Sequence, residues 1–141
     1  MLENDVGSMS KDRNRWFGLL PAVLVMAAIF ILSHQEKPPS LGNDPELSAM
    51  LGHLVAYGVL AAAMLAGLVW IELPFRQAAV AAIGMSVAFG ITDELHQRFV
   101  PGRHADPWDL LADLIGATVA VGIVALLRIR ATTRWPPTRP L

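Results

Sequence analysis

The 141-residue sequence contains no cysteine, which excludes disulfide bonds, thiolate catalysis and cysteine metal sites. Charge is also scarce: 16% of the residues are charged and 54% are apolar, whereas soluble domains average about 25% charged and roughly 45–50% apolar residues. These charges are too few to cover the surface of a soluble globular protein. The high apolar content also excludes an intrinsically disordered chain. The formal net charge of −1 provides no basic surface, so we expect no nucleic-acid partner.

The apolar residues gather in four runs that are nearly free of charge. The runs span residues 16–33, 47–71, 75–92 and 110–127. Each is comparable with the roughly 20 residues that a helix needs to cross a bilayer. We therefore predict four transmembrane helices, at about 16–34, 47–71, 75–97 and 107–127. Because the connections are short, the expected fold is all-α, a polytopic membrane protein built as a compact four-helix bundle.

The basic residues predict how the chain crosses the membrane. One side of the predicted bundle carries Lys11, Arg13, Arg15, Arg76, Arg128, Arg130, Arg134 and Arg139. The other side carries only Lys37, Arg98 and Arg103. The positive-inside rule then makes both termini cytoplasmic in a multi-pass protein of the cytoplasmic membrane. The expected parts are a basic amino-terminal segment (1–15), the transmembrane domain (16–127) and a basic, proline-rich tail (128–141).

The residues able to perform chemistry fall on the predicted outer side, including all four histidines. In the third predicted helix, Asp93, His96 and Gln97 share one face at positions i, i+3 and i+4. Glu94 points about 100° away from that face, toward Arg98 at its own i+4. This helix therefore presents a polar stripe next to the outer surface.

Two other predicted helices present polar stripes at the same depth. His53 and Tyr57 are four residues apart on the second helix, and Asp109 and Asp113 are four apart on the fourth. An ionisable group inside a membrane segment costs at least about 2.5 kcal/mol and is usually paired or lines a water-filled cavity. The three stripes therefore predict either internal ion pairs that lock the helix ends or a polar site between helices.

Arg98 and Arg103 lie on the side where positive charge is disfavoured. Either the nearby acids hold them there, or they receive an anion such as phosphate, for which arginine is well shaped. The candidate substrate-binding residues are Arg98, Arg103, His53, Tyr57, Gln97 and Asp113. The candidate catalytic residues, which would act by general acid–base chemistry, are Asp93, Glu94, His96 and Asp109.

Two other kinds of site are available on paper. Oxygen and imidazole ligands for a metal would come from Asp93, His96, His53, Asp109 and Asp113. The Asp-x-x-His spacing alone is a weak signal, so no metal is assigned and the cofactor is left undefined. The sequence also contains the residue types of a Ser–His–Asp catalytic triad, Ser33, His53 and Asp113, but it has no nucleophile elbow.

The polar motifs resemble those of the VanZ-like membrane proteins, whose pattern is a DE-x-HQ helix end, a PGR loop and a D-x-x-x-N-x-x-G helix start. In this chain TDELHQRFVPGR occupies residues 92–103, followed by Asp109 and by DLIG at 113–116. Further matches are His53 with Tyr57, as H-x-x-x-Y, and Ser33 with Gln35, as S-x-Q. The resemblance extends over about residues 16–127.

Two positions depart from the family pattern. Asp113 stands where members usually have Asn, and Met50 stands where they commonly have Lys. Both changes make the local charge more negative. The resemblance implies a small four-helix integral membrane protein, and the family's namesake is associated with low-level resistance to the glycopeptide antibiotic teicoplanin.

Two functions are compatible with these residues. In the first, an outer-face polar pocket binds a cell-envelope lipid or a lipid-linked cell-wall intermediate and affects glycopeptide susceptibility; whether the pocket also modifies its ligand is left open. In the second, the protein is a non-catalytic scaffold whose charged cluster is a structural clamp. Stripes of small residues would then bind a partner membrane protein. The expected partners are thus membrane lipids, lipid-linked envelope intermediates or another membrane protein.

Overall fold

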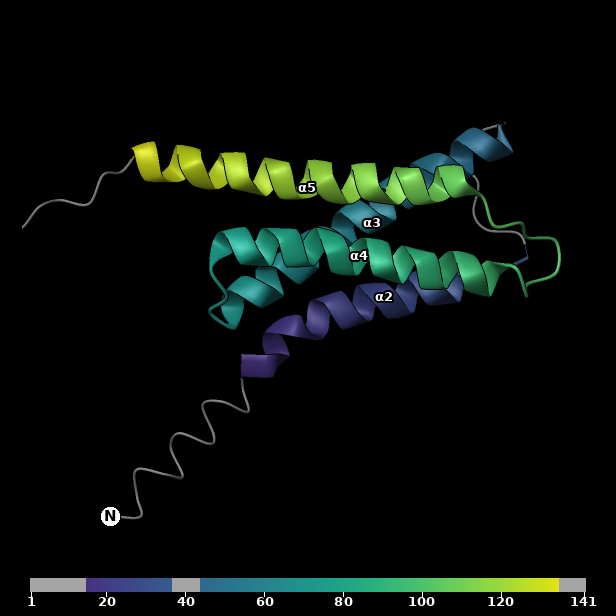
Figure 1. The fold of residues 1–141 in the computed structure, drawn as a ribbon, viewed down its shortest axis with the longest axis horizontal. Helices are drawn as coiled ribbons and strands as arrows, with labels where there is room; N and C mark the ends of the chain where they lie inside the picture. Colours follow the sequence, from purple (N-terminus) through teal and green to yellow (C-terminus); the bar gives the residue numbers. More distant parts are fainter. Residues whose placement is uncertain (1–14, 37–43, 135–141) are drawn as a thin grey trace, which may run out of the picture.

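A computed structural model describes residues 15–36 and 44–134, and every regular element in these ranges is a helix (Figure 1). The elements are η1 (Trp16–Leu19), α2 (Leu20–Ser33), α3 (Pro45–Trp70), α4 (Phe75–Gln97) and α5 (Pro107–Arg134). Several predictions lie outside the described residues, namely those that concern Lys11, Arg13, Lys37, Arg139, most of the amino-terminal segment and the second half of the tail.

Four helices are long and apolar enough to cross a membrane, which confirms the predicted all-α fold with four spanning helices. The spans are Trp16–Ser33, Pro45–Trp70, Phe75–Gln97 and Pro107–Ala131. The first combines η1 with α2, whose first turn contains Pro21. The last helix continues beyond the predicted residue 127 to Arg134, because arginines do not interrupt a helix and the next proline is Pro136.

An aspartate followed by a proline begins each of the two helices α3, which carries His53 and Tyr57, and α5, which carries Asp109 and Asp113. The Asp44 carboxylate accepts hydrogen bonds from the backbone N–H groups of Glu46 and Leu47, at 3.0 and 3.2 Å. The Asp106 carboxylate accepts one from the N–H of Trp108 at 2.9 Å. Such caps satisfy backbone donors at a helix start, and a proline at the first helical position has no N–H that needs a partner.

The helix α3 is the centre of the bundle and contacts each of the other helices. In Figure 1 it runs diagonally behind α4. Its first half packs against α5, where a Cβ added to Gly116 would overlap the backbone of Leu54. Its second half packs against η1, where a Cβ on Gly67 would lie 2.6 Å from the carbonyl oxygen of Gly18. Glycine thus permits the close backbone approach by which helices associate in lipid.

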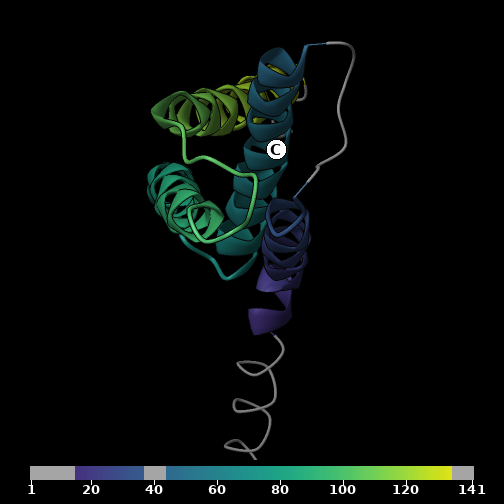
Figure 2. The same ribbon diagram turned by 90° about the vertical axis from the view of Figure 1, so that its right-hand side faces the viewer.

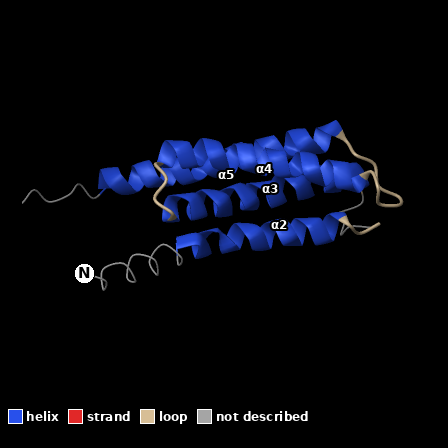
Figure 3. Cartoon of the chain, turned by 60° about the horizontal axis from the view of Figure 1, so that its bottom comes forward, coloured by secondary structure: helices blue, strands red, loops and turns tan. Residues whose placement is uncertain are grey.

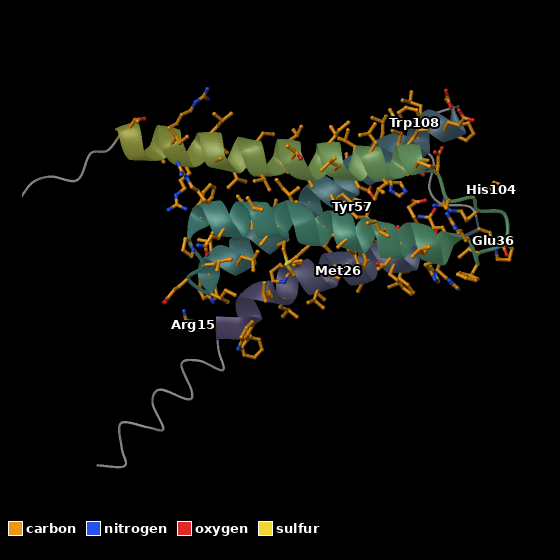
Figure 4. All side chains as sticks on the ribbon, in the orientation of Figure 1. Arg15, Met26, Glu36, Tyr57, His104 and Trp108 are labelled. Atoms are coloured by element: carbon orange, nitrogen blue, oxygen red, sulfur yellow. The ribbon has the colours of Figure 1, made fainter. Side chains whose placement is uncertain are left out.

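Helices α2 and α4 end at the same end of the bundle at which α3 and α5 begin, and we call this the polar end. Figure 2 looks onto it, with the α4–α5 loop crossing the view. Figure 3 shows that loop at one end of the bundle and the α3–α4 connection at the other. In Figure 4, Glu36, His104 and Trp108 are at the polar end, Tyr57 lies deeper inside and Arg15 is at the opposite end.

Candidate functional site

The imidazole of His53, on α3, lies between two carboxylates of α5. Its Nδ1 is 2.9 Å from Asp113 Oδ1, and its Nε2 is 3.7 Å from Asp109 Oδ2. The His53 side chain is 11% exposed and the Asp113 side chain is fully buried. One turn deeper on α3, the Tyr57 ring stacks parallel to the imidazole, with the ring centroids 5.8 Å apart. The structure therefore joins two of the predicted stripes into one cluster.

A glycine on α4 makes room for the buried carboxylate of Asp113. A Cβ added to Gly90 would lie 2.5 Å from Asp113 Oδ2 and 3.3 Å from the Tyr57 ring. Gly90 belongs to a stripe of small buried residues along α4, which is Ala78, Ala82, Ser86 and Gly90. This stripe lets α3 and α5 approach α4 closely enough to bury the cluster.

A second hydrogen-bonded cluster links α2, α4 and the α4–α5 loop. Ser33 Oγ donates to Asp93 Oδ2 at 2.8 Å, and Gln97 Nε2 donates to the same oxygen at 3.1 Å. Arg103 Nη2 in turn donates to Gln97 Oε1 at 2.7 Å. Asp93 and Gln97 are both buried. The i, i+4 pair predicted on α4 thus connects the end of α2 to the loop.

The PGR motif of the loop forms a β-turn that returns Arg103 to the bundle. The N–H of Arg103 donates to the carbonyl oxygen of Val100 at 3.1 Å, and Gly102 between them has φ of +77°. A proline at the second position and a positive φ at the third define a type II turn, in which glycine is favoured at the third position. The Val100–Arg103 turn therefore directs the half-buried Arg103 guanidinium toward Gln97.

Arg103 has no carboxylate within 4.0 Å among the residues that the structure describes. Its Nε is buried and makes no hydrogen bond there. It is attracted electrostatically to Asp109 without touching it. The guanidinium is therefore held by a neutral amide and keeps donors for another group.

Glu94 is held by the loop and not by Arg98. Its Oε2 accepts a hydrogen bond from the backbone N–H of Asp106 at 2.9 Å, while its Oε1 is buried and unpartnered. Arg98 is exposed, caps the end of α4 and makes no side-chain hydrogen bond or ion pair with the described residues. The predicted Glu94–Arg98 pairing does not form, because α4 ends at Gln97 and the Arg98 side chain is exposed while the Glu94 carboxylate is buried.

His96, like Asp93, faces the end of α2, but it makes no hydrogen bond with Asp93 or Gln97 in the described part of the chain. Its Nε2 is 3.2 Å from His34 Nδ1, and the two rings are stacked. Its ring centroid is also 4.4 Å from that of Phe30. His34 was not a predicted site residue, although its position at the end of the first run was the available signal.

The Ser33–His53–Asp113 triad is not assembled in the structure. Ser33 donates to Asp93, whereas His53 pairs with Asp113 and faces Asp109. A different set has the geometry to hold a cation: ligand atoms of His53, Glu94 and Asp109 all lie within 4.8 Å of one another. Asp93 and His96, which the sequence offered as metal ligands, are not members of this set.

Residues 19–128 match the model of the VanZ/LLP1 family. The chain belongs to this VanZ-like family. The match confirms the resemblance drawn from the motifs, and it includes both clusters of the polar end. Neither curated proteins nor solved structures provide a significant match. Together with its four apolar helices, family membership makes the chain a multi-pass membrane protein of VanZ-like type.

In this VanZ-like protein, several buried side-chain atoms have no hydrogen-bond partner in the described part of the chain. They are Tyr57 OH, Ser86 Oγ, Asp93 Oδ1, Glu94 Oε1, Arg103 Nε and Asp113 Oδ2. Native proteins leave few buried polar atoms unpaired, and such atoms usually meet a water, an ion or a ligand. All of these atoms except Ser86 Oγ belong to the polar-end residues already described, which makes this end the candidate functional site.

Proposed function

We propose that the polar end binds the phosphate-bearing head group of a cell-envelope lipid or a lipid-linked cell-wall intermediate. The observation that carries this proposal is Arg103, a half-buried guanidinium held by the neutral Gln97 amide. Arginine offers a planar fork of donors that matches phosphate oxygens, and its charge is always present. A phosphate at this position would provide the counter-charge that the guanidinium lacks among the described carboxylates.

The place of Arg103 in the bundle agrees with a lipid ligand. The loop that carries it joins the ends of two spanning helices, which is where the head groups of a bilayer lie. The unpartnered atoms of the polar end, including the hydroxyl of Tyr57, can accept from or donate to the sugar or hydroxyl groups of such a ligand. We expect the carboxylates of the polar end to position the ligand or, if the protein is an enzyme, to transfer protons.

We further propose that the polar end faces outward and that both termini are cytoplasmic. Arg15, Arg76 and Arg128 are at the opposite end of the described bundle, as the positive-inside rule requires of a cytoplasmic side. Because the chain lacks cysteine, single-cysteine variants can test this directly. A membrane-impermeant maleimide should label His104→Cys in intact cells and Glu72→Cys only after permeabilisation; the reverse pattern would refute the orientation.

The main test is mass spectrometry of the lipids that remain on the purified protein. Wild type should retain a phosphate-bearing lipid, and Arg103→Gln should lose most of it while staying folded. Arg76→Gln is the matched control, because it removes an exposed arginine at the opposite end. Arg98→Gln tests the other arginine near the loop, and we expect a smaller loss of lipid because Arg98 is exposed and makes no side-chain hydrogen bond or ion pair with the described residues of the clusters. Equal retention by wild type and Arg103→Gln would refute the proposal.

The same preparation tests turnover. Incubation of the retained lipid with wild type and with Glu94→Gln would reveal a modified product only if the acids act in catalysis. In cells, replacement of wild type by Arg103→Gln should change teicoplanin susceptibility at an unchanged protein level. This readout connects the site to the phenotype that the family resemblance implies.

A non-catalytic scaffold is the second candidate, and one observation favours it. Hydrogen bonds at the polar end connect α2 to α4 and α3 to α5, as a clamp would. If this is their whole role, Arg103→Gln should lower the thermal stability of the protein and leave its lipid content per folded molecule unchanged. Loss of lipid from a protein of unchanged stability would exclude the clamp as a sufficient account.

A further inference from the structure

We infer that His53, Glu94 and Asp109 together bind one divalent transition-metal cation, such as Zn²⁺ or Mn²⁺, with Asp113 positioning the imidazole. The three ligands come from three different helices, α3, α4 and α5. One imidazole and two carboxylates form a mixed nitrogen–oxygen set, which suits these cations better than the softer ions that prefer sulfur. Three protein ligands would leave coordination positions open for water or for a ligand oxygen.

The distances are those of a site that needs only a small contraction to close. The ligand atoms lie within 4.8 Å of one another, and the His53 Nε2 to Asp109 Oδ2 distance is 3.7 Å. Metal bonds of about 2.0–2.2 Å place neighbouring ligand atoms about 3.0–3.5 Å apart. The ligand atoms of His53 and Asp109 are therefore already near that spacing. A rotation of the Glu94 side chain would bring its oxygen to the same distance from them.

The hydrogen bond on the far side of the imidazole is an independent indication of a metal ligand. Histidines that bind metals commonly donate their other ring N–H to a carboxylate, which fixes the tautomer and the ring orientation. His53 Nδ1 is 2.9 Å from Asp113 Oδ1 in this arrangement. When Nδ1 carries the proton, Nε2 presents a lone pair toward Asp109, so two electron-pair donors face each other across the site. A cation between them turns this repulsion into attraction.

The free oxygen of Glu94 is a second indication. Glu94 is only 8% exposed, and its Oε1 has no hydrogen-bond partner in the residues described, although Oε2 is bound by the Asp106 amide. A buried carboxylate oxygen without a partner is costly. Coordination of a cation shared with His53 and Asp109 would satisfy it.

The charge balance of the polar end also favours a cation. Its buried or half-buried carboxylates are Asp93, Glu94, Asp109 and Asp113. Against these four carboxylates, the described ranges place one half-buried side chain with a permanent positive charge at this end, that of Arg103. Charges in membrane segments are normally compensated within the bundle, and a dication reduces this excess of negative charge. The inference does not depend on lipid binding, although the same cation would attract a phosphate.

Metal content of the detergent-purified protein is the first test, with an affinity tag that contains no histidine. Wild type should carry about one Zn²⁺ or Mn²⁺ per chain by inductively coupled plasma mass spectrometry. Metal content should fall at least roughly tenfold in His53→Ala, Glu94→Gln and Asp109→Asn. The matched controls are His104→Ala and Glu46→Gln, exposed residues of the same end, which should keep the metal.

A titration of stripped wild type keeps the inference falsifiable if a ligand variant fails to fold. After chelator treatment, wild type should bind Co²⁺ with a visible d–d absorption band, and Zn²⁺ should displace it. Asp113→Leu should weaken the affinity by roughly 10–100-fold, and Asp113→Asn should restore much of it because its amide oxygen can still accept from Nδ1. If Asp113→Leu lowered the affinity only by disturbing the fold, the hydrogen-bond acceptor of Asp113→Asn would not be expected to restore it.

The contrary result is a folded wild type that purifies without metal and binds none of the three ions in large excess. His53 would then be a protonated clamp between Asp109 and Asp113. Lipid retention is measured separately, with and without chelator. If a wild type that binds none of these ions still retained lipid through Arg103, the metal inference would fail and the proposed lipid function would stand.

Discussion

The two ends of the bundle hold their charges in opposite ways. At the end where α3 meets α4, Arg15 and Glu72 form an ion pair of 2.7 Å whose side chains are 35% and 77% exposed. Arg15 also donates to the carbonyl oxygen of Ile71 at 3.1 Å. At the polar end, His53 and Asp113 pair with side chains 11% and 0% exposed.

The difference shows which charges need an explanation beyond the fold. An exposed pair contributes about 0–1 kcal/mol and suits the region where a helix leaves the membrane. A buried pair pays a desolvation penalty that its attraction often fails to recover, so an apolar pair would serve stability as well. Burial of His53 and Asp113 therefore points to a role in binding or chemistry.

The largest expected effect comes from breaking the buried pair. His53→Leu leaves the Asp113 carboxylate buried without its partner, which should lower the free energy of unfolding by about 3–5 kcal/mol. The double variant His53→Leu/Asp113→Leu should recover much of this loss, because no buried charge remains. Unfolding in detergent with chelator present measures both. A double variant as unstable as the sum of the two single variants would contradict the assignment.

The next effect tests the close approach of α3 and α5 that buries the pair. A Cβ at Gly116 would overlap the backbone of Leu54, so Gly116→Ala should destabilise the bundle by about 1–3 kcal/mol. Gly122→Ala is the control on the same helix, since a Cβ there meets nothing within 4 Å. It should be neutral or stabilising by up to about 1 kcal/mol. Equal unfolding free energies for the two variants would show that the helices do not pack this closely.

A smaller effect is expected in the loop. Gly102 has φ of +77°, so Gly102→Ala should cost about 1–2 kcal/mol and displace Arg103. Gly102→Asn should cost less, because asparagine tolerates this conformation. Thermal unfolding and lipid retention are the two measurements. If Gly102→Ala retained as much lipid as wild type, the turn would not be what positions Arg103.

The smallest effect belongs to the exposed end. Glu72→Gln removes the ion pair with Arg15 and should change the unfolding free energy by less than about 1 kcal/mol. It should leave metal and lipid content unchanged. A loss as large as that of His53→Leu would remove the distinction between the two ends.

The spans could be predicted because their signal is local. Charge-free runs of sufficient length define helices in a bilayer whatever they pack against, and the observed α4 has the predicted bounds. The predicted end of the last helix at residue 127 is too early, because an arginine at position 128 ends the apolar run but not the helix. In the structure the Arg128 guanidinium lies over the Phe75 ring, 4.6 Å from its centroid, and the helix continues past it.

The partners within the site could only partly be predicted. Spacing identified the stripes, but the choice between Asp109 and Asp113 as the hydrogen-bond partner of His53 depends on how α3 crosses α5. Spacing also favours Arg98 as the neighbour of Glu94. That preference assumed a continuing helix, whereas the chain leaves α4 at Gln97 and a loop amide reaches the carboxylate.

Two hydrogen bonds of the polar end each join residues 60 positions apart, Ser33 with Asp93 and His53 with Asp113. During insertion into the membrane, neither bond can form until the second half of the chain has arrived. A nascent or truncated chain that lacks α5 has no Asp113 to pair with His53, so the imidazole lies in the second span without this partner. The polar end can therefore close only after all four spanning helices have been inserted.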